Sequence, residues 1–235
     1  MLLRLRVSLP DRPGSLGQVA RTLGVVGADI VQVVVLERVG GRAVDDFAVV
    51  WPAAAPVDRV LAGLAVIPGV RVDGAWRTTE LPDPSAREVA IVGQIAANPA
   101  YGLSTLVDAA PGVCAADWAA VLSVPRDWAS VGGLAPDVLC ASLRAPEVPQ
   151  IPDIAPLRPR AMSAGGGTHL AVAPFHRGGL VLAVARGRAD GDGDGEPGLY
   201  PPPFHRSEVD RLAQFVDAVA VVLGDRLTDV TRVAA

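Results

Sequence analysis

Two hydrophobic periods alternate along the first 77 residues, and this alternation restricts the fold more than any other feature of the sequence. Every second residue of Leu3–Leu9 is apolar, which is the period of a strand with one buried face. Apolar residues then recur at helical spacing from about Ser15 to the glycines Gly24 and Gly27, so we expect a helix there. The Val-rich run Asp29–Glu37 follows and predicts a second strand.

The same stretch continues with a hairpin, a helix and a last strand. Gly40-Gly41 is a two-residue hairpin signal before the predicted strand Ala43–Trp51. Helical spacing over Val57–Leu64 ends at Pro68-Gly69, and Val70–Trp76 predicts the fourth strand. The order βαββαβ is the ferredoxin-like arrangement. We therefore predict an α+β fold in which two helices cover one face of a four-stranded antiparallel sheet.

The turn between the first strand and the first helix carries a family resemblance. The segment Leu5–Leu16 (LRVSLPDRPGSL), followed by a helix and then by Gly27-Ala28-Asp29-Ile30, resembles an ACT domain. The resemblance covers about residues 2–78 and implies a small regulatory domain over residues 1–78. Members of this family commonly bind amino acids, whereas many others serve only as assembly modules. Both functions stay open at this point.

Physical arguments also favour a ligand at this turn. Gly14 lets a ligand approach the backbone closely, and Pro13 fixes φ. The amides that follow lie at a helix N-terminus and favour a carboxylate, while Asp11 is suited to an α-ammonium. The alternative is a tight strand-to-helix turn that Asp11 caps. The predicted ligand-binding residues are Asp11, Arg12, Pro13, Gly14, Ser15, Leu16, Asp29, Ile30, Val31 and Gln32.

Asp29 departs from the family pattern, because ACT domains often carry an amide at the start of the second strand. An acid at this position either anchors an ammonium group or repels a carboxylate. The sequence leaves both readings open.

Residues 79–86 are polar, contain proline and show no period, so they predict a linker to a second domain over residues 87–235. In this domain, segments with the helical spacing of apolar residues are followed by segments with the spacing of strands. Residues 145–167 are rich in proline and show no period, which indicates a loop that is either a lid or partly disordered. We expect Ser207 and Asp210 to form the capping box of its last helix. The other predicted elements are a helix from Glu88 to Asn98-Pro99, a helix ending at Pro111-Gly112, strands Trp118–Val124 and Val138–Leu143, and a hairpin of His169–Phe175 with Gly179–Arg186.

The second domain resembles a GAF-like domain over about residues 86–228. The segments that carry the likeness are Leu170–Phe175, Gly179–Arg186 and Phe204, which leads into the final helix. The resemblance implies an α+β domain with a central antiparallel sheet that senses a small molecule or a signal. It also implies a dimer formed through the terminal helices.

Composition and motif spacing exclude several function classes. The 21 basic residues are all arginine and the 25 acidic residues give a net charge of −4, so nucleic acid is not an expected partner. The absence of lysine is typical of GC-rich bacterial coding. Apolar and polar residues alternate at the N-terminus, whereas a signal peptide has a continuous apolar block. No run approaches 18 apolar residues, the length of a membrane-spanning helix. We therefore expect a cytoplasmic protein without a membrane partner. Cys114 and Cys140 are expected to be buried and unbridged.

The sequence shows no arrangement typical of a cofactor, metal or catalytic site. Gly193–Gly198 matches G-x-G-x-x-G, but the surrounding acids repel a pyrophosphate. The acids from Asp190 to Asp194 match half of a calcium loop, whose twelfth position holds Pro201 in place of glutamate. The three histidines lack zinc spacing, and no G-x-S-x-G elbow is present. We therefore expect a non-enzyme with no catalytic residues, no metal site and no cofactor.

These observations lead to one functional expectation with one alternative. The chain is expected to be a regulatory sensor that binds a free amino acid at the ACT-like domain and forms a homodimer. Arg4 and Arg6 are expected on an uncovered sheet face suited to pairing with a second copy. In the alternative, the chain is an assembly subunit that regulates a partner enzyme without binding an amino acid.

Overall fold

A computed structural model describes residues 1–53, 55–78, 84–124, 136–176, 179–187 and 199–227. The chain forms two compact units. The first comprises Met1–Leu81 with Arg188–Pro202, and the second comprises Pro82–Gly187 with Pro203–Ala235. Both units are α+β with a central antiparallel sheet, which confirms the predicted fold class.

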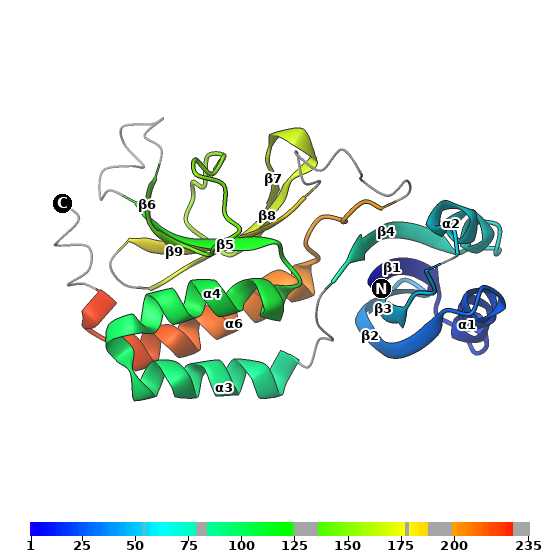
Figure 1. Cartoon of the computed structure of the whole chain (residues 1–235), viewed down its shortest axis with the longest axis horizontal. Coiled ribbons are helices and arrows are strands. Elements are labelled where there is room, and N and C mark those ends of the chain that lie inside the picture. The colour runs from blue at the N-terminus through cyan, green and yellow to red at the C-terminus, as the bar shows by residue number, and fades with distance from the viewer. Residues whose placement is uncertain (54, 79–83, 125–135, 177–178, 188–198, 228–235) are drawn as a thin grey trace. The chain divides into compact units, whose positions relative to one another are not determined.

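The first unit has the predicted element order, with both helices on one face of its sheet (Figure 1). The antiparallel strand order is β2-β3-β1-β4, so β1 and β3 are central and β2 lies at an edge. This is the ferredoxin-like arrangement. The elements are β1 (Leu2–Pro10), α1 (Ser15–Val25), β2 (Asp29–Val39), β3 (Arg42–Val50), α2 (Val57–Ala65) and β4 (Arg71–Arg77).

The alternation of β1 determines the two faces of this sheet. Its odd-numbered residues Leu3–Leu9 are buried in the core beneath the helices, together with Phe47 and Trp51. The even-numbered Arg4 and Arg6 lie on the other face, as predicted. Both arginines are buried, so the prediction that this face is uncovered is wrong at these residues; their guanidinium groups bind the Asp46 carboxylate at 2.8 Å, which compensates their charge.

A bridge far along the chain extends the first unit. The amide of Ala75 donates to the carbonyl of Tyr200 at 2.9 Å, and the Tyr200 amide donates back to Ala75. A Cβ at Gly74 would lie 2.5 Å from Pro202 Cδ, so only glycine leaves room for the returning segment. Periodicity does not reveal this pairing, because the two partners are distant in sequence.

In the second unit, two helices, α4 and α6, pack on one face of a five-stranded sheet with the order β6-β5-β9-β8-β7, and α3 packs against these two helices (Figure 1). The predicted hairpin of residues 169–186 is confirmed as β8 and β9. Every residue of β9 is buried. The elements are α3 (Pro84–Ala97), η1 (Pro99–Tyr101), α4 (Gly102–Cys114), β5 (Trp118–Ser123), β6 (Asp137–Ala141), β7 (Arg160–Ser163), η2 (Gly165–Gly167), β8 (His169–Pro174), β9 (Leu180–Arg186) and α6 (Arg206–Leu223).

Two local predictions in the second unit are wrong. The capping box of α6 is formed by His205 and Glu208 and not by Ser207 and Asp210. The His205 side chain accepts a hydrogen bond from the Ser207 amide, and the Glu208 side chain accepts one from the His205 amide at 2.7 Å. The Pro-rich stretch 145–167 contains the strand β7, which is too short and polar to show a period. Its Ile154 is buried against the sheet face opposite the helices.

Candidate functional site

The turn that joins β1 to α1 is compact and held by backbone hydrogen bonds. Gly14 adopts the left-handed region with a φ of 92°, and apart from its chain neighbours no atom of the described residues lies within 4 Å of the position a Cβ would take. The Asp11 amide donates to the Gly41 carbonyl at 2.8 Å, which ties the turn to the β2–β3 hairpin. Arg12 and Pro13 are exposed. The turn therefore leaves open space directly before the helix.

The first turn of α1 has no side-chain cap, because Gly14 occupies the N-cap position. The Ser15 amide donates to the Arg12 carbonyl, so this predicted ligand donor is used within the turn. Among the described residues, no acceptor binds the amides of Leu16 and Gly17. Free amides at a helix N-terminus carry partial positive charge and favour an anion.

The Asp11 carboxylate is bound to a residue that the sequence analysis did not select. The Arg38 guanidinium donates to it twice, at 2.8 and 3.0 Å. Both side chains are partly exposed. Asp11 therefore does not cap α1, and the Arg38 cation already balances its charge.

A second carboxylate, Asp45, lies on the helix-covered face of the sheet, where it pairs in register with Val7 of β1 and Val35 of β2. Asp45 is only 1% exposed, and its Oδ1 accepts no hydrogen bond within the described chain. Burial raises its pKa above the ordinary aspartate value. The nearby Asp11 and Asp46 carboxylates raise the pKa further, whereas Arg38 lowers it.

The structure separates the predicted site residues into two groups. The turn Asp11–Leu16 follows Pro10, which pairs with Arg42 at one end of the sheet. Asp29 pairs with Val50 at the other end, and β1 between them spans nine residues, or roughly 25 Å. Within one chain, the group Asp29–Gln32 therefore does not lie beside the turn.

The start of β2 forms an exposed edge. Asp29 and Val31 are exposed, whereas Ile30 packs against the core and Gln32 is half-buried. The register shifts between Ile30 and Gln32, which places Val31 in a bulge. Asp29 and Val31 are therefore accessible, whereas the Oε1 atom of Gln32 is buried.

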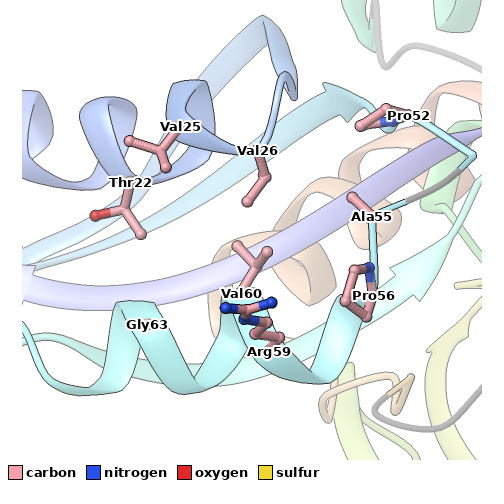
Figure 2. Close-up of a pocket in the computed structure, with 9 residues that line it drawn as sticks. All are labelled: Thr22, Val25, Val26, Pro52, Ala55, Pro56, Arg59, Val60 and Gly63. Atoms are coloured by element: carbon pink, nitrogen blue, oxygen red, sulfur yellow. The ribbon is translucent and has the colours of Figure 1, made fainter.

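A cavity of about 530 Å³ lies between the C-terminal end of α1 and the N-terminal end of α2 (Figure 2). None of the predicted ligand-binding residues lines it. Its walls come from α1, from the connection after β3 and from α2, and are formed by Thr22, Val25, Val26, Pro52, Ala55, Pro56, Arg59, Val60 and Gly63.

Sequence reasoning missed Arg38, Asp45 and the free amide of Gly17. A signal for Asp45 was present, because period two places it on the same face as the buried Phe47. No comparable signal identifies Arg38, whose partner lies 27 residues away.

The described part of the chain contains no candidate metal centre. No cluster of three His, Cys, Asp or Glu side chains suited to a metal ion occurs there. Burial raises the pKa of Cys114 to about 12 and also raises that of Cys140; both are unbridged, as predicted. The dinucleotide-like and calcium-like fragments within 190–198 lie outside the described residues. None of the described helices is long and apolar enough to cross a bilayer.

Comparison with known proteins identifies no family. No family model and no curated protein matches the chain. A formyltetrahydrofolate deformylase from Pseudomonas putida KT2440 is 15% identical over 42% of this chain and 39% of its own length, with a TM-score of 0.30. An unknown protein from Galdieria sulphuraria is 11% identical over 91% of this chain and 90% of its own, also with a TM-score of 0.30. Both TM-scores lie below the level at which a shared fold can be inferred.

Proposed function

We propose that the chain is a non-catalytic regulatory protein whose first unit is an ACT-like module that binds a free amino acid at the β1–α1 turn. One observation carries this proposal. The amides of Leu16 and Gly17 have no acceptor among the described residues, and the buried Asp45, whose Oδ1 accepts no hydrogen bond there, interacts electrostatically with Asp11 of the same turn.

The charges around the turn suit a zwitterion. An α-carboxylate fits the free amides of Leu16 and Gly17, because they carry the positive end of the helix dipole. Asp11 and Asp45 together carry two carboxylates against the single Arg38 cation. An α-ammonium group nearby would add a positive charge and offset the repulsion from Asp11 and Asp46, which together with burial, the larger cause, raises the pKa of Asp45.

The open space at Gly14 supports the same proposal. A side chain at this position would enter the space in front of the amides, and its φ of 92° disfavours any residue with a Cβ. The proposed ligand approaches the helix end through this space.

The second unit is proposed to be a GAF-like module that contributes a dimer contact or senses a second ligand.

The edge of the first sheet favours the alternative function, an assembly subunit that regulates a partner enzyme. β2 is an edge strand whose Val33, Val35 and Val39 are exposed. An edge strand, which has a neighbour on one side only, is suited to pairing with another chain on its other side, and the exposed valines add an apolar surface. Under this alternative, the turn binds no amino acid.

A thermal-shift panel of the twenty amino acids separates the two functions. A ligand at about one hundred times its Kd stabilises the folded state by roughly 2.7 kcal/mol, which is readily measured. We expect one or a few amino acids to raise the Tm of the wild type, and Gly14→Val and Asp45→Asn to abolish the shift. No stabilisation by any amino acid at about 10 mM would favour assembly instead.

The matched control for Gly14→Val is Gly27→Val. Gly27 also has a positive φ, of 77°, but lies at the opposite end of α1. Both variants carry similar backbone strain, so an equal loss of ligand response in the two would indicate general destabilisation. Turnover of any amino acid by the purified wild type would overturn the non-catalytic assignment.

A further inference from the structure

The cavity between α1 and α2 has a lining that specifies a ligand class different from a free amino acid. Figure 2 shows residues of α1 facing those of α2 across the cavity, with the connection after β3 at one end. Its volume of about 530 Å³ falls within the range of roughly 300–1,000 Å³ typical of small-molecule sites.

Nearly all of the lining is apolar. Alkyl and prolyl groups form the walls, among them Val26, Val60 and Pro56. The hydroxyl of Thr22 donates to the Gln18 carbonyl at 3.1 Å, so it already has a partner. A ligand that fills this space therefore needs an apolar body without hydrogen-bonding groups, because each buried polar group without a partner would weaken binding.

Among the described residues that line the cavity, Arg59 is the only charged one. It is exposed, and no described residue forms a hydrogen bond or ion pair with its guanidinium group. The neighbouring acid, Asp58, is also on α2, but adjacent residues on a helix do not face each other. The lining thus combines an apolar surface with one available cation that has five N–H donors.

We propose that this cavity binds a monocarboxylate with an unsubstituted aliphatic chain, such as a medium-chain fatty acid. The carboxylate pairs with Arg59, since guanidinium and carboxylate form charge-assisted bidentate hydrogen bonds. The aliphatic chain lies against Val25, Val26 and Val60, and removing its surface from water supplies the remaining affinity. This site goes beyond the proposed amino-acid function, because it lies at the other end of α1 from Gly14.

Calorimetric titration of the full chain with octanoate tests this proposal. We expect octanoate to bind the wild type, and Arg59→Gln to weaken binding by about tenfold or more, as for the loss of a charge-assisted pair. Octanamide, which has a similar shape without the charge, is expected to bind the wild type at least about tenfold more weakly than octanoate. Arg21→Gln is the matched control, because it removes the same charge from an exposed position of α1 outside the cavity.

A second variant tests the cavity itself. A Cβ at Gly63 would lie 3.6 Å from Thr22 Cγ2, so Gly63→Leu places a longer side chain in the space while favouring the helix. We expect it to abolish octanoate binding. Gly93→Leu, in the open on α3, is its control and is expected to bind like the wild type.

The proposal is overturned if octanoate does not bind the wild type at about 5 mM, a concentration that detects even weak small-molecule sites. It is also overturned if Arg59→Gln weakens binding by less than about tenfold or if Gly63→Leu still binds. Amino-acid responses in the thermal-shift panel should be unchanged in Arg59→Gln. The two sites can therefore fail independently.

Discussion

The Asp11 carboxylate and the Arg38 guanidinium form a bidentate ion pair, with N–O distances of 2.8 and 3.0 Å across 27 residues of sequence. This pair joins the β1–α1 turn to the far end of β2. It also means that the acid expected to receive an ammonium already has a cationic partner. Asp45, buried on the same face of the sheet as the helices, has an Oδ1 that accepts no hydrogen bond from the described residues, and the Arg38 charge acts on it only electrostatically.

Removing the Arg38 cation tests the electrostatic coupling between Arg38 and Asp45. In Arg38→Gln, we expect the pKa of Asp45 to rise further, because Arg38 is the charge that lowers it. The free energy of unfolding should change by less than about 1 kcal/mol, since the ion pair is exposed. Titration of the Asp45 carboxyl by NMR checks the first expectation, and an unchanged or lowered pKa would contradict the coupling.

The raised pKa of Asp45 predicts a pH-dependent stability. A carboxyl with a raised folded-state pKa binds its proton more tightly in the folded protein, so stability falls as pH rises from about 3.9 through the folded pKa. Asp45→Asn should remove this loss and gain stability over the wild type at pH 7, with a smaller gain at pH 4. Urea unfolding at both pH values measures the difference. The exposed Asp58→Asn is the control, and an equal gain there would count against the assignment.

The buried cation of the second unit predicts a large stability effect. Arg186 is 1% exposed, donates to both Glu208 oxygens at 2.9 and 3.0 Å, and lies over the Phe204 ring. Glu208→Ala leaves this charge without its carboxylate and removes half of the capping box, so we expect a loss of about 3–5 kcal/mol in urea unfolding.

The control for this variant is Asp210→Ala. Within the described part of the chain, Asp210 forms one exposed ion pair, with Arg206 at 3.7 Å, so its loss should cost less than about 1 kcal/mol. If the two variants lose equal stability, the α6 cap involves Asp210 as the sequence suggested, and the role assigned to Glu208 is wrong.

The two thiols are predicted to be unreactive in the folded protein. Burial raises the pKa of Cys114 to about 12, and Cys140 is shifted in the same direction. Because the thiolate is the nucleophile, alkylation at pH 8 should be slow in native buffer and rapid in denaturant. Mass spectrometry after iodoacetamide treatment measures both rates, and fast native labelling of Cys114 would contradict its burial.

Local periodicity predicted the scaffold well. The alternation of Leu3–Leu9 gave the correct buried face of β1, and the apolar hairpin at 169–186 was found because each strand is long and regular. The strand β7 escaped prediction because four residues carry too little periodic signal.

Non-local contacts were beyond the reach of the sequence. The Asp11–Arg38 pair and the Ala75–Tyr200 bridge each join residues far apart in the chain, and no local pattern encodes them. The cavity at α1 and α2 also depends on how two helices pack. In contrast, the burial of Asp45 follows from the same period that predicted β3.

The most direct test of the amino-acid site is to follow the backbone amides of Leu16 and Gly17 by NMR during a ligand titration. The ligand is the amino acid that gives the largest thermal shift. If none gives a shift, each of the twenty amino acids is titrated. The account predicts saturable chemical-shift changes at these two amides, retained in Gly27→Val and lost in Asp45→Asn. If both amides stay unchanged at saturating ligand, or at about 10 mM of every amino acid, no amino acid binds at the N-terminus of α1.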